Sequence, residues 1–175
     1  PEMSREQRDQ IVNNIHNETL RLNSLASSFL DLARLESGRV QFRKTRFSAA
    51  DLLYEVRDVM ITKAQETNVQ IRVDVPHDMP LLEADRDKIK QVLLNLMSNA
   101  IKYNRPNGSV IITGNFTDAE VSLNIQDTGL GIPEDAVPHL FEKFFRVREH
   151  EGKAAGTGLG LSICKQIVQG HNGRI

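Results

Sequence analysis

Apolar residues recur at intervals of three, four and seven over the first 37 residues. They are Ile11, Ile15, Leu22, Leu25, Phe29 and Leu32, with Glu18 interrupting the series. This spacing places one apolar stripe on a long helix, which we predict over residues 4–37, with Gly38 just beyond its end. A helix of this length cannot bury such a stripe alone, so we expect it to pack against another helix.

The remaining apolar patterns predict helices and strands in runs rather than in regular alternation. Strands are expected at residues 40–42, 69–75, 109–116 and 120–127, the last two forming a hairpin. Helices are expected at residues 48–67, 85–103 and 158–169, with a short helix beginning at Pro133, and residues 76–84 are expected to form a loop. Ser48 and Asp85 are typical N-cap residues. This order is typical of an α+β domain in which one sheet carries helices on one face.

The composition limits the classes of protein to which the chain can belong. A chain of 175 residues suits one medium domain with an appendage, or two small domains. A net charge of -1 gives no electrostatic support for binding nucleic acid or an anionic membrane, so we expect no nucleic-acid partner. The single cysteine, Cys164, excludes an internal disulfide and is expected to be a small buried side chain. No apolar run reaches the length of a membrane span, so we expect a cytoplasmic location, with or without a membrane anchor elsewhere in a parent protein.

The helix expected at residues 85–103 carries two different stripes. Its apolar stripe consists of Ile89, Val92, Leu93, Leu96, Met97 and Ala100, and is expected to face the core. Its polar stripe consists of Gln91, Asn95, Asn99 and Lys102, with Tyr103 at the edge. Asparagine is a poor helix former, so two of them one turn apart carry a local cost. Either the stripe is a solvated face, or the amides point into a site where their oxygens ligate Mg²⁺ and Lys102 reaches a phosphate.

The stretch "GTGLGLSIC", residues 156–164, places three glycines on alternate positions at the start of a predicted helix. It does not match a dinucleotide fingerprint, because Leu161 follows where the third glycine belongs and no strand precedes it. It does not match a P-loop either, since the only Gly-Lys pair, at residues 152–153, is followed by Ala154. Taken alone, the stretch is either a flexible loop before a helix or a place where backbone amides approach a phosphate.

Four segments together resemble the sequence boxes of sensor histidine kinases. "QVLLNLMSNAIKY" resembles the N box, "DTGLGIP" the first glycine box, "FEKFFR" the phenylalanine box and "GTGLGLSIC" the second glycine box. They occur in the family's order within residues 85–164, which makes the resemblance specific. The resemblance implies an α+β fold, the two-layer α/β sandwich with a mixed sheet of the GHKL (Bergerat) ATP-binding family. The leading helix resembles the second helix of the family's dimerisation hairpin.

The resemblance also implies a set of site residues. The residues implied to bind ATP are Asn95, Asn99, Lys102, Tyr103, Asp127, Gly129, Gly131, Gly156, Thr157, Gly158, Leu159 and Gly160. Among them Asn99 would be the Mg²⁺ ligand, supported by Asn95, and Lys102 would contact phosphate. Asp127 would accept a hydrogen bond from the adenine amino group, as an ionised carboxylate can. Asn95, Lys102 and Arg146 are the implied catalytic residues.

The glycines and the phenylalanines have implied roles of a different kind. Gly129 and Gly131 would let the backbone close over the base, and the glycines of the second box would let helix N-terminal amides face the phosphates. Residues 146–155 would form a mobile ATP lid, charged and with little to bury. Phe141, Phe144 and Phe145 are expected to pack and to anchor that lid.

The residue at position 95 bears on the reaction. Relatives with this fold that hydrolyse ATP use a glutamate one turn before the magnesium asparagine, which is the position of Asn95 here. An amide cannot take a proton from water, so the resemblance implies phosphoryl transfer to a supplied nucleophile, by a protein histidine kinase. The implied partners are a response regulator receiver domain and the phosphoacceptor hairpin of the same parent protein, which we expect to be a homodimer.

The resemblance divides the chain into three parts. Residues 1–38 would be a partial dimerisation domain, residues 39–47 a linker, and residues 48–175 a catalytic domain truncated at its C-terminus. No histidine lies in the H-E-x-R-x-P context of a phosphoacceptor; His16 lacks the Arg and Pro, and the other four histidines are expected at the surface. The alternative is a non-catalytic nucleotide-binding or docking module with a vestigial ATP site.

Overall fold

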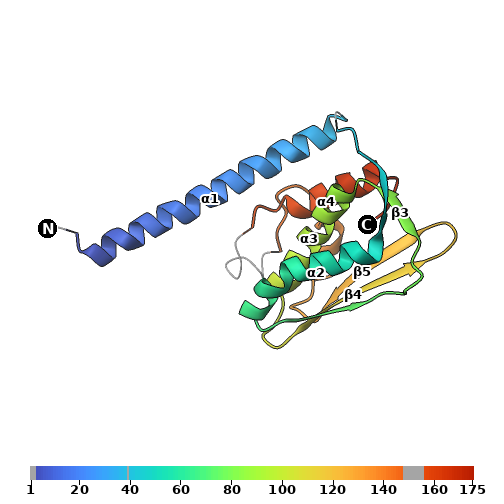
Figure 1. Cartoon of the computed structure of the whole chain (residues 1–175). Coiled ribbons are helices and arrows are strands. Elements are labelled where there is room, and N and C mark those ends of the chain that lie inside the picture. Colours follow the sequence, from blue (N-terminus) through green and yellow to red (C-terminus); the bar gives the residue numbers. More distant parts are fainter. Residues whose placement is uncertain (1–2, 39, 148–155) are drawn as a thin grey trace.

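The computed structural model describes residues 3–38, 40–147 and 156–175. A long helix leads into a compact α+β unit, from which it projects (Figure 1). The helices are α1 (Arg5–Glu36), α2 (Ala49–Glu66), α3 (Arg86–Lys102) and α4 (Gly160–Gly170), with a 3₁₀ turn, η1, at Val137–His139. The strands are β1 (Thr45–Ser48), β2 (Gln70–Asp74), β3 (Leu81–Ala84), β4 (Ser109–Phe116) and β5 (Val121–Asp127).

Side-chain caps fix the starts of the first three helices, as the sequence predicted for two of them. Ser4 and Gln7 form a reciprocal capping box at the start of α1. The Ser48 hydroxyl accepts a hydrogen bond from the Asp51 N–H, and the Asp85 carboxylate accepts one from the Lys88 N–H. Each cap satisfies a backbone donor that has no partner within its own helix.

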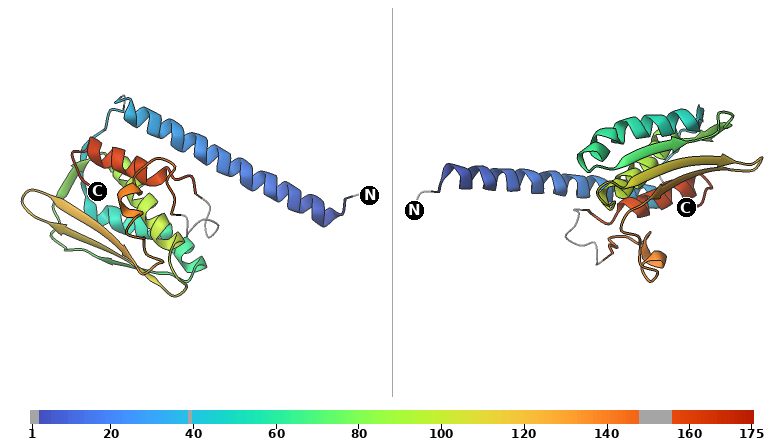
Figure 2. Two further views of the ribbon diagram at one scale, coloured as in Figure 1. Left: turned by 180° about the vertical axis from the view of Figure 1, so that it is seen from behind. Right: turned by 90° about the horizontal axis from the view of Figure 1, so that it is seen from below.

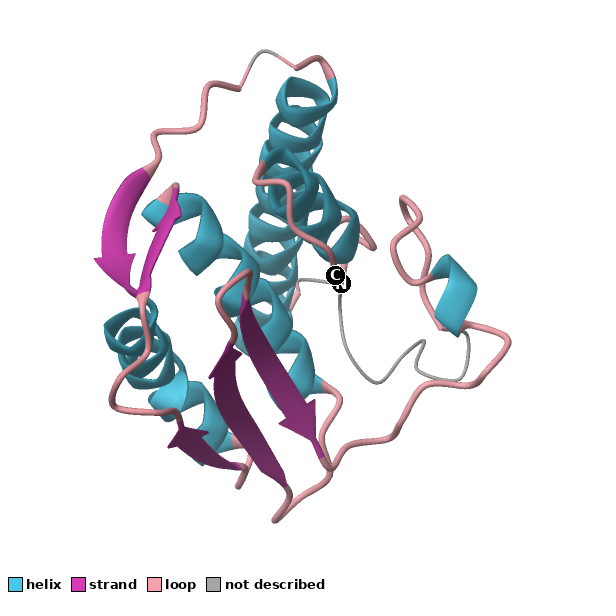
Figure 3. Ribbon diagram, turned by 90° about the vertical axis from the view of Figure 1, so that its right-hand side faces the viewer, coloured by secondary structure: helices cyan, strands magenta, loops and turns pink. Residues whose placement is uncertain are grey.

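The main sheet is mixed, which confirms the predicted fold class. Strand β4 lies in the centre, parallel to β2 and antiparallel to β5. Val110 pairs with Ile71 on one side and with Asp127 on the other, so the register places Asp127 at the end of the sheet where β4 begins. The helices lie behind this sheet in Figure 3, which shows the two layers.

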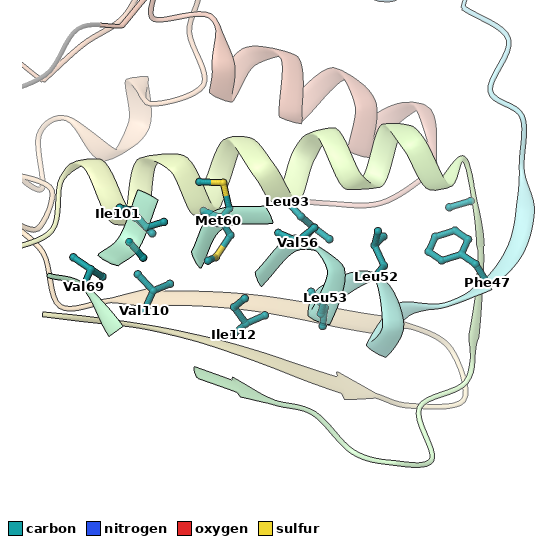
Figure 4. Close-up of a cluster of buried hydrophobic side chains, with 14 residues drawn as sticks. Phe47, Leu52, Leu53, Val56, Met60, Val69, Leu93, Ile101, Val110 and Ile112 are labelled. Carbon is teal, nitrogen blue, oxygen red and sulfur yellow. The ribbon is translucent and has the colours of Figure 1, made fainter. Parts of the chain in front are cut away.

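The main core fills the space between the sheet and helices α2 and α3 (Figure 4). In this core, three residues of α2 and two of β4 are fully buried: Leu52, Leu53 and Val56, and Val110 and Ile112. The predicted core stripe of α3 divides between two clusters: Leu93, Met97 and Ala100 join the main core, whereas Val92 turns to a second one.

The second cluster joins α4 to α3 and to the end of α1. Ile163, Cys164 and Ile167 of α4 and its N-cap residue Leu159 pack there with Val92 and with Leu32, which is only 2% exposed. The predicted buried role of Cys164 is thereby confirmed. The earlier turns of α1 extend beyond this contact, as both views in Figure 2 show, and Ile15 and Leu22 are 61% and 59% exposed. Within the described residues, no helix is long and apolar enough to cross a membrane.

Four expectations about local structure differ from the structure. Residues 40–42 do not form a strand; β1 begins at Thr45 and pairs antiparallel with β3 in a separate two-stranded sheet. Strand β3 lies where a loop was expected. Both strands have only four residues, so their extended form depends on pairing across the chain rather than on a local pattern. The short helix expected from Pro133 is the 3₁₀ turn beginning at Val137, and α4 begins at Gly160, two residues later than predicted.

The apolar residues that suggested a strand at 40–42 are used differently. The Phe42 ring packs against His171, with ring centroids 4.4 Å apart. His171 is not a simple surface residue, because its Nε2 accepts a hydrogen bond from the Asp85 N–H at 3.0 Å and its Nδ1 lies 2.8 Å from the Ile167 carbonyl oxygen. The Asp85 carboxylate also accepts from the Arg43 N–H at 2.9 Å. The segment between α1 and β1 is therefore held at the start of α3 and the end of α4.

Candidate functional site

The polar stripe of α3 faces the second glycine box. A Cβ built on Gly160 would lie 3.8 Å from the Asn95 side chain, and one built on Gly156 would lie 2.9 Å from the Lys102 Nζ. Asn95, Asn99 and Lys102 are all half-buried. Because Asn95 and Lys102 are half-buried beside Gly160 and Gly156 of the box, the stripe is not a solvated face. The two segments that the sequence singled out separately therefore lie side by side and form one candidate site.

The N-terminus of α4 differs from those of the other long helices. Its N-cap is Leu159, which has no side-chain oxygen and makes no capping hydrogen bond. The Leu159 side chain is fully buried in the second cluster, so only its backbone is available to a ligand. The Leu159 N–H donates to the Thr157 hydroxyl at 3.3 Å. The first-turn amides of a helix that lacks a side-chain cap, together with the positive end of its dipole, suit an anion such as phosphate.

The phenylalanine box meets the second glycine box at Gly158. The Phe144 N–H donates to the Gly158 carbonyl at 2.9 Å, and a Cβ at Gly158 would lie 2.7 Å from the Phe144 carbonyl carbon. Gly158 also has a φ of +71°, so both its backbone conformation and its surroundings favour glycine. The chain segments on either side of residues 148–155 are thus joined.

The prediction of an ATP lid at residues 146–155 lies largely outside the described residues. Arg146 is described and half-buried. Phe141 and Phe145 are half-buried, in keeping with a packing role. The packing role expected of Phe144 is wrong, since its side chain is 56% exposed and its backbone makes the contact instead.

The first glycine box closes onto the end of α3. Asp127 is exposed at the end of β5, and its Oδ1 accepts a hydrogen bond from the Gly129 N–H at 2.8 Å. The Leu130 N–H donates to the Tyr103 carbonyl at 3.0 Å. A Cβ at Gly129 would lie 2.5 Å from that same carbonyl oxygen, so only glycine allows this approach. Asp127 and Tyr103 are therefore brought to one end of the site, and Gly131, with a φ of +74°, completes the turn beside them.

The donor set favours a phosphate-bound cation over an all-protein metal centre. Among residues 3–38, 40–147 and 156–175, no group of three or more His, Cys, Asp or Glu side chains is placed to hold a metal ion. The amide oxygens of Asn95 and Asn99 remain, one helical turn apart. Mg²⁺ prefers oxygen ligands and usually keeps waters and phosphate oxygens in its shell, so this sparse set fits it.

One ionisable group close to the site is strongly perturbed. Burial raises the pKa of the Cys164 thiol to about 11, and a hydrogen bond with the Asn95 side chain partly opposes the rise. The thiol is thus neutral at physiological pH and packs beneath Asn95. The Lys102 ammonium lies 4.8 Å from the centroid of the Tyr103 ring, within the range of a cation–π interaction.

The sequence did not reveal how α3 and the first glycine box are held together. Residues 104–108 were interpreted only as a turn, yet the Asn104 Oδ1 accepts from the Thr128 hydroxyl at 3.2 Å, 24 residues away. No local feature of "NRPNG" predicts this partner. The only signal was a second asparagine-rich segment immediately after the polar stripe.

The geometry above agrees with a comparison of the chain with known protein families. Residues 84–175, more than half of the chain, match the family described as "Histidine kinase-, DNA gyrase B-, and HSP90-like ATPase". The matched residues contain α3, β4, β5, both glycine boxes and α4. The chain belongs to this family. It carries the ATP-binding catalytic domain of a sensor histidine kinase, which confirms the predicted family and the predicted fold.

Relatives and solved structures cover α1 as well as this histidine kinase domain. The adaptive-response sensory kinase SasA of Gloeothece citriformis is 36% identical over 155 residues, which are 88% of this chain and 39% of that protein. The crystal structure of full-length ShkA in complex with AMPPNP has a TM-score of 0.81 at 29% identity, and the match covers 97% of this chain and 35% of ShkA. The histidine kinase ThkA in complex with the response regulator protein TrrA has a TM-score of 0.76 at 29% identity, with 98% of this chain and 47% of ThkA covered. The chain therefore spans less than half of each of these proteins.

Proposed function

We propose that this chain is the part of a sensor histidine kinase that binds ATP and transfers its γ-phosphoryl group to a phosphoacceptor histidine outside the chain. The observation that carries the proposal is the contact of Asn95 and Lys102 with the second glycine box. The amide of Asn95 and the ammonium of Lys102 lie beside the segment that leads into the uncapped N-terminus of α4, and this combination of groups supports the binding of phosphates.

Each predicted site residue has a role in this proposal. Asp127 accepts a hydrogen bond from the adenine amino group, and Tyr103 and the first glycine box line the base. Lys102 and Arg146 bind phosphate oxygens. The backbone of residues 156–160 faces the phosphates, including that of Leu159, whose side chain belongs to the core. Asn99, with Asn95 beside it, holds Mg²⁺, which neutralises charge on the phosphates when bound.

The nature of Asn95 supports transfer over hydrolysis. A general base must accept a proton, and a carboxamide does not do so near neutral pH. Asn95 lies half-buried beside Gly160 and the neutral Cys164 thiol, neither of which can act as a base near neutral pH. The proposal therefore assigns the chain to positioning and charge stabilisation of ATP while a histidine of the parent protein supplies the nucleophile.

The proposal extends to the parent protein. Residues 1–38 would belong to its dimerisation hairpin, residues 39–47 would link it to the catalytic domain at 48–175, and the parent would act as a homodimer. The exposed apolar stripe of α1 supports a helical partner there. The structure of ThkA with TrrA supports a response regulator receiver domain as the partner that takes the phosphoryl group.

Calorimetric titration of the chain with ATP tests the proposal. We expect binding that weakens at least tenfold without Mg²⁺ and in Asn99→Ala, and that is lost in Asp127→Asn, because each change removes a polar partner of the nucleotide. Asn115→Ala and Asp118→Asn are matched controls on exposed positions of the β4–β5 hairpin, and should bind as the unchanged chain does.

A second step separates the kinase from a docking module with a vestigial site. The chain is mixed with radiolabelled ATP, Mg²⁺ and a separately supplied phosphoacceptor hairpin. Acid-labile label on the hairpin, absent with Asn99→Ala, supports the kinase. ATP binding without any transfer, or no binding by a folded chain, would favour the docking module.

A further inference from the structure

Asn104 is the residue after the C-cap of α3, and every hydrogen-bonding position of its amide is used. Its Nδ2 donates to the Ala100 carbonyl at 3.0 Å and to the Ser109 carbonyl at 3.1 Å. Its Oδ1 accepts from the Arg105 N–H at 2.9 Å and from the Thr128 hydroxyl at 3.2 Å. Two donors meet two carbonyls and the oxygen meets two donors, so the partners fix the orientation of the amide.

Thr128 completes the connection from the side of the first glycine box. Its hydroxyl accepts from the Ser109 N–H at 2.9 Å while it donates to Asn104, and its own N–H donates to the Ser109 carbonyl at 3.1 Å. Thr128 lies between Asp127, whose carboxylate is proposed to read the base, and Gly129, which closes onto Tyr103. The Thr128 side chain is exposed, so core packing does not explain this residue.

Gly108 leaves the space in which the two side chains meet. A Cβ at this position would collide with the Asn104 Oδ1 and would lie 2.8 Å from the Thr128 hydroxyl oxygen. We call Asn104, Gly108, Ser109 and Thr128 the clasp. It joins three elements: the end of α3, the start of β4 and the loop after β5.

We propose that Asn104 and Thr128 are positioning residues that set the orientation of the Asp127 carboxylate and so determine the preference of the site for adenine. Asp127 is the last residue of β5, and its Oδ1 is bonded to the Gly129 N–H, so the carboxylate turns with the loop that the clasp holds. The clasp also begins directly after Lys102 and Tyr103. It therefore keeps the group that reads the base at a set distance from the group that binds phosphate. This inference rests on the proposed function.

The test compares ATP with inosine triphosphate, in which a carbonyl oxygen replaces the adenine amino group. An oxygen that accepts cannot pair with a carboxylate that accepts, so the unchanged chain should prefer ATP. Thr128→Val keeps the shape and removes the hydroxyl; we expect the ratio of the two dissociation constants to fall by about fivefold to tenfold, the usual effect of one hydrogen bond. Thr128→Ser keeps the hydroxyl and should retain the preference.

The matched control is Thr117→Val. The Thr117 hydroxyl is also exposed and also accepts from backbone N–H groups, those of Ala119 and Glu120, but it lies in the β4–β5 turn. Thr117→Val should leave the preference for ATP over inosine triphosphate unchanged. Thr128→Ala serves as a second variant should Thr128→Val not fold. In the double variant Asn104→Ala/Thr128→Val, the preference should fall no further than in the more damaging single variant, because the two residues act as a pair.

The outcomes separate this inference from the proposed function. Failure of the unchanged, folded chain to bind ATP would overturn both. Binding of ATP together with an unaltered preference in Thr128→Val and Thr128→Ala would overturn the inference alone. Equal weakening of the binding of ATP and of inosine triphosphate would also overturn the inference, since that result indicates a structural role without control of base selection. Additive losses of the preference in the double variant would overturn it as well.

Discussion

The two glycine boxes of this site are held in different ways. The first box is fixed by hydrogen bonds from the chain itself: Leu130 to Tyr103, Thr128 to Ser109 and Gly129 to Asp127. The second box begins a helix whose N-cap has no side-chain oxygen, and it lies against the polar side chains of Asn95 and Lys102. The end that we propose to bind the base is thus held by the chain's own hydrogen bonds, whereas the end that we propose to bind the phosphates offers amides and charge that an anion would satisfy.

The largest effect should follow from adding one methyl group to the base end. In Gly129→Ala the new Cβ would lie 2.5 Å from the Tyr103 carbonyl oxygen, which already accepts from the Leu130 N–H. Neither backbone segment can withdraw without breaking a hydrogen bond, so we expect a loss of about 2–3 kcal/mol in the free energy of unfolding. Urea denaturation measures it, and ATP titration should show lost binding.

The same substitution at the phosphate end provides the control. In Gly160→Ala the new Cβ would lie 3.8 Å from the Asn95 side chain, an ordinary contact, at the first residue of α4. Alanine is preferred to glycine in a helix, so the free energy of unfolding should stay equal or rise by up to about 1 kcal/mol. A greater loss of stability in Gly160→Ala than in Gly129→Ala would reverse the comparison.

Removing the positive charge of Lys102 should weaken the binding of ATP but not that of adenosine. Lys102→Met keeps an unbranched side chain and removes the ammonium beside Gly156, so ATP affinity should fall about tenfold. Adenosine, which has no phosphate, should bind to both proteins alike. Calorimetry at low and high salt tests whether the charge is the cause, because salt screening should reduce the difference in ATP affinity between the unchanged chain and Lys102→Met. Lys88→Met, at the other end of α3, is the control; equal losses for ATP and adenosine would contradict the assignment.

The smallest effect concerns the packing beneath the phosphate end. Burial raises the pKa of Cys164 to about 11 from its ordinary value of 9.0. The contribution of the neutral thiol to stability is therefore complete below pH 9 and is lost as the pH rises from 9 to 11. Between pH 8 and 9.5 the loss should be below about 1 kcal/mol. Urea denaturation across this range measures it, and Cys164→Ala should remove that part of the pH dependence; an identical dependence in both proteins would show that the thiol does not titrate with unfolding.

The sequence predicted the helices more successfully than the short strands. Helix α3 begins after Asp85 as expected, because its cap and both of its stripes are local features, and it ends at Lys102, one residue before the predicted end. Strands β1 and β3 were misplaced or missed, since four residues carry too little alternation and are stabilised by each other. Phe42 suggested a strand, yet its ring packs on His171, a partner far along the chain that no local pattern specifies.

The sequence by itself determined the family, the polar stripe on α3 and both glycine boxes, because fixed spacings on a helix and in tight turns encode them. Only the tertiary structure decided which segments meet: that Gly156 and Gly160 lie against Lys102 and Asn95, and that Asn104 binds Thr128. The physical reason is that a residue's backbone conformation depends mainly on its neighbours in the sequence, so local features can be predicted from the sequence. The contacts join residues that are far apart in the sequence, and only the packing of the sheet, α3 and α4 brings them together.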